Sequence, residues 1–369
     1  MIPFLQLTPG PDRAAIAAAI ARVIDRGWFI LGPELENFEK AFAAATGARH
    51  AVGVGNGTDA LAIAMRAAGV NAGDEVITSP LSAAYTAMAI MMVGARPIFA
   101  DIDPVRLTID PQAAAAAVTT RTAAIIPVHL YGQAADMHRI AAVAARHGLA
   151  IIEDCCQAHL ATCGGRPVGS FGLAAAYSFY PTKNLGALGD AGALTTNDDR
   201  VAAHARRLRN GGQTDRYHHA EFGVNSRLDE VQAAVLFERL RGLNETTRLR
   251  RALAGQYRAG LAGAESVLVP PEQDAGHVYH LFPVLAEYRD ALQRHLKQQG
   301  VETLVHYPVP IPRQQALARE EPSDCPVATR VCDRVLSLPL YPALESEAID
   351  QVVAAVRSLP MASVSLPRT

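Results

Sequence analysis

Apolar runs of strand length alternate with helix-like segments up to about residue 240, and this alternation limits the fold more than any other feature. Strands of continuous apolar character that are separated by helices indicate a parallel sheet covered on both faces. In such sheets, ligands bind beyond the carboxyl ends of the strands. We therefore predict an α/β fold with its site at those ends. The expected strands include residues 51–54, 74–78, 96–101, 122–128 and 149–153.

The pattern changes beyond residue 240. An arginine-rich helix is expected at 245–261, followed by strands at 278–286 and 301–306 with a helix between them. A length of 369 residues exceeds what one small core needs. We therefore predict a large domain over residues 1–240 and a smaller α+β domain over residues 241–369, and the N-terminal helices are candidates to pack on the smaller one.

The composition is that of a globular protein. Hydrophobic residues make up 50% of the chain and charged residues 19%, and the net charge is −2. Because no basic block is present, nucleic acid is a poor candidate partner. Apolar stretches such as residues 83–95 are shorter than the ~18 residues that a membrane helix needs, and the first residues do not resemble a signal peptide. We expect a cytoplasmic protein that binds neither nucleic acid nor membrane.

The cysteines do not indicate a disulfide framework or a metal site. There are five, an odd and sparse set for a chain of this length, and none forms a C-x-x-C pair. Cys155 and Cys156 would face opposite ways on a strand. His218 and His219 are adjacent in a polar loop and need not converge on one ion. We therefore predict no metal.

Lys183 occupies an unusual place for a solvated amine. It lies between the apolar run 173–177 and a glycine-rich turn, in a stretch that begins at Ser178. Burial lowers the pKa of a lysine, and a neutral amine can attack a carbonyl. One hypothesis is a Schiff-base lysine that holds pyridoxal phosphate (PLP). The alternative is an exposed loop lysine, and the local context leaves both open.

The stretch Gly55-Asn-Gly-Thr-Asp59 follows an expected strand and opens an expected helix. Glycines let the backbone approach a ligand closely, and free N–H groups at a helix start favour an anion such as phosphate. Thr58 adds a hydroxyl donor. The alternative is a simple capping turn. The stretch lacks the lysine of a P-loop and the spacing of a dinucleotide fingerprint, which disfavours ATP and NAD.

Asp154 ends the expected strand that begins at Leu149. A carboxylate at the end of a buried strand is costly without a cationic partner. A protonated pyridine nitrogen would serve, and the ion pair would strengthen the PLP ring as an electron sink. The alternative is a cap or a structural salt bridge. Gln157, three residues further on, is a candidate to contact the ring hydroxyl. The alternative is that its side chain is a solvated loop amide.

Taken in order along the chain, these stretches closely resemble the DegT-type (DnrJ/StrS-like) family of sugar-nucleotide aminotransferases. The resemblance implies the PLP-dependent transferase fold of the aspartate aminotransferase type. That fold has a large domain with a mixed, mostly parallel seven-stranded sheet and a smaller α+β C-terminal domain. The resemblance also implies a PLP-dependent aminotransferase. It covers nearly the whole chain, with supporting matches at 32–39, 128–132, 153–159, 189–192, 223–229 and 306–308.

The resemblance also implies roles for single residues. Lys183 would hold PLP and act as acid and base in the proton shift, and Asp154 would hold the pyridine nitrogen. Gln157 would lie near the ring oxygen. Asn225 would reach the phosphate of the neighbouring subunit's cofactor, so that a homodimer would share its active sites. The other expected cofactor contacts are Gly57, Thr58 and Ser178 at the phosphate, with Asp59, where relatives often carry a small residue.

Two places depart from the family pattern. Relatives place an aromatic ring over PLP from the helix after the second strand, and here Ala83 stands at that position. Tyr85 is the nearest ring and is included as a candidate contact, although a helix turns about 100° per residue, so the two positions face different ways. The second departure is Pro312, where many relatives carry a histidine near the substrate.

The resemblance favours a keto carbon at C3 of a nucleotide-linked 6-deoxysugar as the amino acceptor, with glutamate as the expected donor. The presence of Lys183 argues for transamination, because dehydratase relatives carry histidine there. The alternatives are a 4-keto sugar or cyclitol aminotransferase, and a non-catalytic PLP-binding regulator. Candidate substrate-binding residues are Tyr180, Arg227, His306 and Tyr307.

Overall fold

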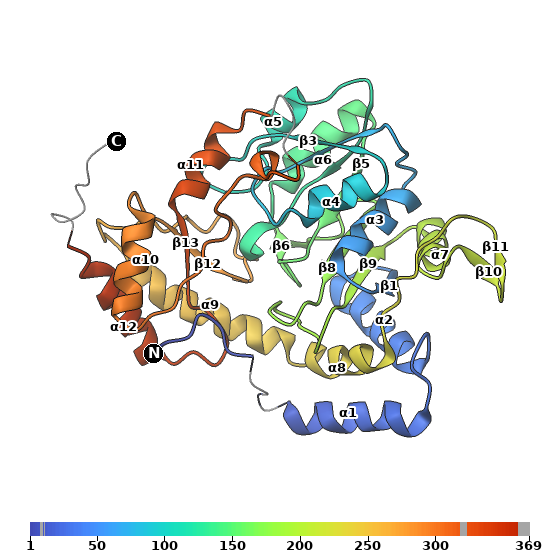
Figure 1. Ribbon diagram of the computed structural model, residues 1–369, viewed down its shortest axis with the longest axis horizontal. Helices are drawn as coiled ribbons and strands as arrows, with labels where there is room; N and C mark the ends of the chain where they lie inside the picture. The colour runs from blue at the N-terminus through green and yellow to red at the C-terminus, as the bar shows by residue number, and fades with distance from the viewer. Residues whose placement is uncertain (8–9, 11, 318–322, 361–369) are drawn as a thin grey trace.

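A seven-stranded sheet lies at the centre of the larger part of the computed structural model, which describes residues 1–7, 10, 12–317 and 323–360 (Figure 1). The strand order is β1-β9-β8-β5-β4-β2-β3. β9 runs antiparallel to both of its neighbours, and the other adjacent strands pair in parallel. The predicted α/β fold with a mixed, mostly parallel seven-stranded sheet is confirmed. The strands are β1 (His50–Val54), β2 (Glu75–Thr78), β3 (Arg96–Phe99), β4 (Thr122–Ile126), β5 (Ala150–Asp154), β8 (Ala174–Ser178) and β9 (Gly192–Thr196).

β9 begins in a stretch that the sequence presented as part of a glycine-rich turn. Gly192 pairs with Val54 of β1 on one side and with Ser178 of β8 on the other. A Cβ atom at Gly192 would lie 2.4 Å from the backbone carbonyl of Asn56. Glycine is therefore required for the strand to lie this close to the loop after β1. In this way β9 brings that loop and the end of β8 together.

Helices cover both faces of the sheet, as continuous apolar strands require. Neighbouring residues of a strand point to opposite faces, so Tyr177 and Ala176 belong to different buried clusters. One face is covered by α2, α5, α6 and α8, and the other by α3, α4 and α7. These helices are α2 (Pro33–Thr46), α3 (Gly57–Ala67), α4 (Tyr85–Met92), α5 (Pro111–Ala116), α6 (Met137–His147), α7 (Asp199–Leu208) and α8 (Glu230–Leu240).

A smaller layer with its own apolar core follows in the chain. The antiparallel pair β12 and β13 packs with α9, α10 and α12 around buried side chains that include Tyr257, Phe282 and Val352. The division at residue 240 falls between α8 and α9 and stays a prediction. The elements are α9 (Leu243–Gly260), β12 (Phe282–Leu285), α10 (Arg289–Gln298), α11 (Pro326–Arg334), β13 (Val335–Leu338) and α12 (Ser346–Arg357).

The strand expected at 301–306 is not formed as such. Instead, two of its residues form isolated backbone bridges to different segments: Val301 bridges to Ile2, and Leu304 bridges to Ser337 of β13. The extended residues at the N-terminus thus contact the smaller layer. The first helix, α1 (Arg13–Arg26), instead packs against α8.

Short pairs of strands and single-turn helices complete the described part of the chain. No helix within those residues is long and apolar enough to cross a membrane. The hairpin formed by β10 and β11 projects from the side of the sheet near α7 (Figure 1). The short elements are β6 (Thr162–Cys163), β7 (Arg166–Pro167), β10 (Gln213–Asp215), β11 (His218–His219), η1 (Leu130–Gly132) and η2 (Ile311–Arg313).

Candidate active site

The candidate site lies where β5 and β8 end beside the start of α3. Asp154 ends β5, Ser178 ends β8, and Gly57 opens α3. A Cβ atom at Gly57 would lie 2.8 Å from the Cβ of Ser178 and 2.9 Å from the Sγ of Cys156. The start of α3 therefore touches both strand ends, and glycine makes that contact possible. This is the edge of the sheet at which the sequence predicted ligand binding.

The start of α3 offers free backbone donors. The side chain of Asn56 accepts the N–H of Asp59 at 2.8 Å and so caps the helix. The N–H groups of Gly57 and Thr58 make no hydrogen bond to the described residues. Two unpaired donors at the positive end of a helix form a suitable site for a phosphate.

Asp154 is a buried carboxylate that the fold holds in one orientation. It is 4% exposed, and its two oxygens accept hydrogen bonds from the Thr86 hydroxyl at 2.7 Å and from the Cys156 N–H at 3.1 Å. It forms no salt bridge within the described ranges. A buried carboxylate whose two described hydrogen-bond donors are neutral is suited to a cationic ligand group, such as a protonated pyridine nitrogen. Thr86, which follows Tyr85 in the first turn of α4, was not identified as a site residue from the sequence.

Lys183 is partly buried, and its ammonium makes no salt bridge or hydrogen bond within the described chain. Burial lowers the pKa of Lys183, while Cys156 and Asp154 act in the opposite direction. A lower pKa increases the fraction of neutral amine, which is the form that attacks a carbonyl. The backbone N–H of Lys183 donates to the carbonyl oxygen of Tyr180 at 2.8 Å, which fixes the turn that carries the side chain.

Gln157 is fixed by groups from two distant segments. Its Oε1 accepts the backbone N–H of Tyr131 at 2.9 Å, and its Nε2 donates to the hydroxyl of Tyr307 at 3.0 Å. Since a backbone N–H can only donate, the amide orientation follows from this contact. Burial, with smaller contributions from Asp154 and Cys156, raises the pKa of Tyr307 to about 12. The Tyr307 hydroxyl therefore stays protonated at neutral pH.

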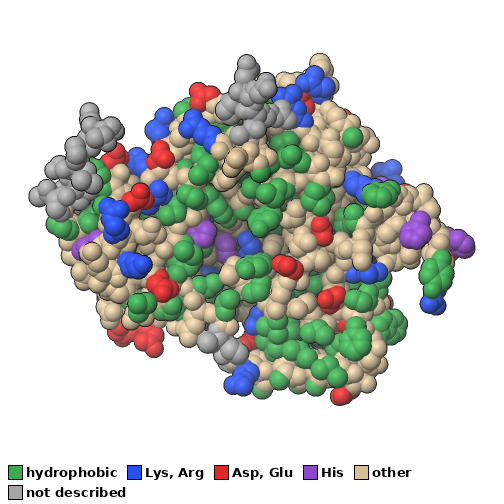
Figure 2. Space-filling model, viewed as in Figure 1, with side chains coloured by type: hydrophobic (Ala, Val, Ile, Leu, Met, Phe, Trp, Pro, Cys, Tyr) green, Lys and Arg blue, Asp and Glu red, His purple; other side chains and the backbone are tan. Residues whose placement is uncertain are grey.

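Neutral imidazoles surround the lysine on the side of the smaller layer. Burial and the nearby Lys183 lower the pKa of His306 to about 4, and they lower the pKa of His280 well below its ordinary value. His280 bonds through Nδ1 to Asn184 Oδ1 at 3.2 Å, and the Asn184 amide donates to the Val278 carbonyl at 3.0 Å. Basic and histidine side chains gather near the middle of the face in Figure 2. Neither His280 nor Asn184 was identified as a site residue from the sequence.

The remaining candidate residues are either exposed or hydrogen-bonded to residues outside the group around Lys183 and Asp154. Tyr85 and Tyr180 are 64% and 51% exposed in the single chain. Arg227 donates to Asn210 Oδ1 at 3.0 Å, while the Asn225 side chain makes no hydrogen bond to the described residues. The carboxylate of Asp59 accepts hydrogen bonds from Ser226 and Asn56. The structure thus brings together Gly57, Thr58, Asp154, Gln157, Ser178, Lys183, His306 and Tyr307.

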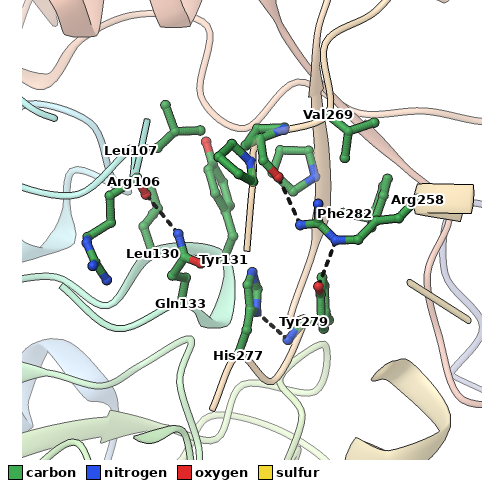
Figure 3. Close-up of a pocket in the computed structure, with 13 residues that line it drawn as sticks. Arg106, Leu107, Leu130, Tyr131, Gln133, Arg258, Val269, His277, Tyr279 and Phe282 are labelled. Atoms are coloured by element: carbon green, nitrogen blue, oxygen red, sulfur yellow. Dashed lines mark hydrogen bonds between the residues drawn. The ribbon is translucent and has the colours of Figure 1, made fainter. Parts of the chain in front are cut away.

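Two other polar groups have their hydrogen bonds within the protein. In the cluster of His129, Glu153 and Cys155, the carboxylate accepts the Gly169 N–H at 2.7 Å and pairs with His129 Nε2 at 3.1 Å. In the small cavity of Figure 3, Arg258 donates to the Tyr279 hydroxyl at 2.9 Å. Hydrogen bonds within the protein account for both groups, so neither indicates a second ligand site.

These features fit PLP at three separate points. The start of α3 suits its phosphate, Asp154 suits its ring nitrogen, and Lys183 suits its aldehyde carbon. Nothing in the donor set requires a different ligand chemistry. The fold and the site together define a PLP-dependent transferase of the aspartate aminotransferase fold type.

Comparison with known proteins defines the family. The model of the DegT/DnrJ/EryC1/StrS aminotransferase family matches residues 11–357. The chain is 46% identical to a dTDP-3-amino-3,4,6-trideoxy-alpha-D-glucose transaminase of Streptomyces venezuelae, over 96% of this chain and 95% of that protein. It is 45% identical to a pleiotropic regulatory protein of Geobacillus stearothermophilus, over 95% of this chain and 96% of that protein. It matches the crystal structure of S. venezuelae DesV in complex with a ketimine intermediate with a TM-score of 0.93 and 46% identity, over 96% of this chain and 97% of that one.

The chain therefore belongs to the DegT/DnrJ/EryC1/StrS aminotransferase family. It is a PLP-dependent aminotransferase, as predicted from the order of its motifs. The roles of Lys183, Asp154 and the other single residues stay predictions.

Gly57→Ala is expected to weaken PLP binding by at least about 10-fold, because the added Cβ would meet Ser178 and Cys156 at under 3.0 Å. Titration of the apoenzyme with PLP, followed by absorbance, measures the effect. Gly255→Ala is the matched control, because a Cβ at this position in α9 has no neighbour within 4 Å. Unchanged PLP affinity in Gly57→Ala would show that the start of α3 does not contact the cofactor.

Proposed function

We propose that this aminotransferase moves an amino group to the keto carbon C3 of a nucleotide-linked deoxysugar, with glutamate as the expected donor. The observation that carries the catalytic part is Lys183, a partly buried amine with a lowered pKa and no salt-bridge partner in the described chain. The name of the S. venezuelae relative, which specifies a 3-amino sugar nucleotide, supports the substrate part.

Each residue of the central group has a definite task in this proposal. Bound PLP supplies an electron sink that makes the α-hydrogen of an amino acid acidic. Lys183 would hold the cofactor through its Nζ, and the same Nζ, once free, would accept a proton as general base and donate it again as general acid. Asp154 would hold the ring nitrogen in its protonated form, and Gln157 would donate to the ring oxygen.

The phosphate is assigned to groups at the start of α3 and the end of β8. The free N–H groups of Gly57 and Thr58 and the hydroxyls of Thr58 and Ser178 act as donors. Asn225 completes this site in the neighbouring subunit, so each active site needs two chains. The side chain of Asn225, which is exposed and makes no hydrogen bond to the described residues, supports this assignment.

Exposed apolar side chains support a homodimer. Trp28 and Phe29 are 54% and 51% exposed, and Met91 and Met92 of α4 are 49% and 57% exposed. Hydrophobic side chains also gather over α1 and α8 on the face seen in Figure 2. Large exposed apolar patches mark interaction surfaces. A second copy of the chain would cover such patches and place Asn225 next to its site.

The sugar substrate is assigned to the opening of the site. Tyr180 and Arg227 belong to the larger layer, whereas His306 and Tyr307 come from the chain beside β13. Tyr307 offers a protonated hydroxyl at neutral pH. Pro312, which stands where many relatives carry histidine, is buried in the single turn η2.

A panel of 3-keto and 4-keto nucleotide sugars, incubated with the PLP-loaded protein and glutamate, tests the proposal. We expect amination of a 3-keto sugar, with the position of the new amine fixed by NMR. Lys183→Ala serves as the blank. Exclusive amination of a 4-keto sugar or a cyclitol ketone would replace the proposed substrate with one of these alternatives.

A PLP-binding regulator is the alternative from another class, and the name of the G. stearothermophilus relative keeps it in view. The two functions differ in the first half-reaction. An aminotransferase converts bound PLP to the pyridoxamine form when an amino donor is added, which shifts the cofactor absorbance. Absence of this shift with every common amino donor would favour the regulator.

Thr86→Val is expected to lower kcat/KM by about 10-fold, because hydrogen bonds to charged groups contribute ~1.5–3 kcal/mol. The change removes the hydroxyl that donates to Asp154 at 2.7 Å and keeps the side-chain shape. Thr108→Val is the matched control, because the buried hydroxyl of Thr108 has no hydrogen-bond partner in the described structure. Equal rates for both variants would contradict a role of Thr86 at Asp154.

A further inference from the structure

Asp59 stands in the first turn of α3, next to the backbone donors assigned to the cofactor phosphate. A free carboxylate there would repel a phosphate. In the structure, however, its Oδ2 accepts the Ser226 hydroxyl at 2.6 Å and the Asn56 amide at 3.0 Å. The short bond from Ser226 is typical of a charge-assisted hydrogen bond. The carboxylate is thereby bound to a segment 167 residues away in sequence.

Ser226 connects this carboxylate to the loop before α3. Its Oγ donates to Asp59 and accepts the backbone N–H of Gly55 at 2.9 Å. Gly55 lies in this loop and Gly57 opens α3 directly after it, and both glycines have wide conformational freedom without external contacts. The Ser226 hydroxyl is thus a donor to Asp59 and an acceptor from Gly55. Both hydrogen bonds restrain the segment that presents the phosphate donors.

The segment around Ser226 is itself well anchored. The backbone N–H of Ser226 donates to the Arg209 carbonyl at 2.9 Å, and Asn225 forms a backbone bridge with Asn210. Ser226 is buried, whereas Asn225 is exposed and its amide makes no hydrogen bond to the described residues. The backbone of Asn225 is thus fixed while its side chain is available to a group outside the chain.

We propose that Asp59 is a positioning residue that ties the phosphate-binding start of α3 to the segment that presents Asn225. Asp59 does not contact the phosphate. This inference rests on the proposed function, in which Asn225 completes the neighbouring site. In that homodimer, the contact between Asp59 and Ser226 links the phosphate ends of the two active sites.

The first experiment measures PLP affinity by titration of the apoenzyme. Asp59→Ala and Ser226→Ala are each expected to weaken PLP binding by about 10-fold, and the double variant no further, because the two side chains act as one unit. Asp110→Ala is the matched control, since Asp110 accepts the Gln112 N–H at 2.9 Å and caps α5 away from the start of α3. It is expected to lower Tm without changing PLP affinity. Additive effects, or a loss of Tm alone, would overturn the positioning role.

The second experiment uses hybrid dimers in which one chain carries Lys183→Ala, so that only the other chain gives the absorbance of lysine-bound PLP. Ser226→Ala is placed on either chain in turn. We expect weaker PLP binding at the reporting site in both placements, through α3 in one case and through Asn225 in the other. An effect confined to the reporting chain would overturn the link between sites. A monomeric protein in light scattering would instead refute the proposed dimer. The proposed activity is tested separately, by amination of the sugars in the substrate panel.

Discussion

Lys183→Ala is expected to abolish transamination, with a fall in kcat of at least about 10³-fold, because general acid–base catalysis alone contributes ~10²–10⁴-fold. The variant also loses the covalent attachment of PLP. Reduction of the PLP-loaded wild-type protein with borohydride, followed by peptide mapping, measures this directly. The pyridoxyl group is expected on Lys183. The other lysines, Lys40 and Lys297, are exposed and serve as internal controls in the same map.

The physical reason is the environment of the amine. Burial lowers the pKa of Lys183, so that more of it is neutral at a given pH than for an exposed lysine. Lys40→Ala and Lys297→Ala are the matched variants, and both are expected to retain full activity. Pyridoxyl label on either of them, or on no lysine, would refute the assignment. So would a Lys183→Ala protein that turns over at the wild-type rate.

The fold was predictable because its signals are local and repeated. Apolar strands that alternate with helices indicate a covered parallel sheet, and the structure has that sheet. The sequence did not reveal β9, since Gly192 is a turn residue by local rules and becomes a strand residue through its pairing with Val54 and Ser178. Residues 301–306 look like a strand, but their partners are single residues far away in the chain.

In the candidate site too, local sequence patterns predicted some residues, whereas contacts between distant parts of the chain determine the positions of others. Asp154 ends a strand and Lys183 follows one, and their position in the sequence is enough to place them at the edge of the sheet. Thr86 and Ser226 act through hydrogen bonds to residues at least 68 positions away, which no local pattern records. The carboxylate of Asp59 was expected at the cofactor, and only the fold shows that Ser226 and Asn56 bind it.

Asp154→Asn is expected to lower kcat by about 10²-fold or more, because loss of ~2.7 kcal/mol of transition-state stabilisation corresponds to that factor. The neutral amide cannot stabilise a protonated ring nitrogen by charge. Its single oxygen can still accept the Cys156 N–H, and its NH₂ group then faces the Thr86 hydroxyl, which can accept as well as donate. The conversion of bound PLP to its pyridoxamine form by glutamate, followed by stopped-flow absorbance, is the measurement. Asp110→Asn, in the cap of α5, is the matched control.

A double-mutant cycle then separates the charge of Asp154 from its orientation. If Thr86 acts only by orienting this carboxylate, Thr86→Val has little further effect in the Asp154→Asn background, and the two changes are strongly non-additive. Additive losses would mean that Thr86 has a separate task. Wild-type rates in Asp154→Asn itself would refute the ion pair with the ring nitrogen and leave the buried carboxylate with a structural role.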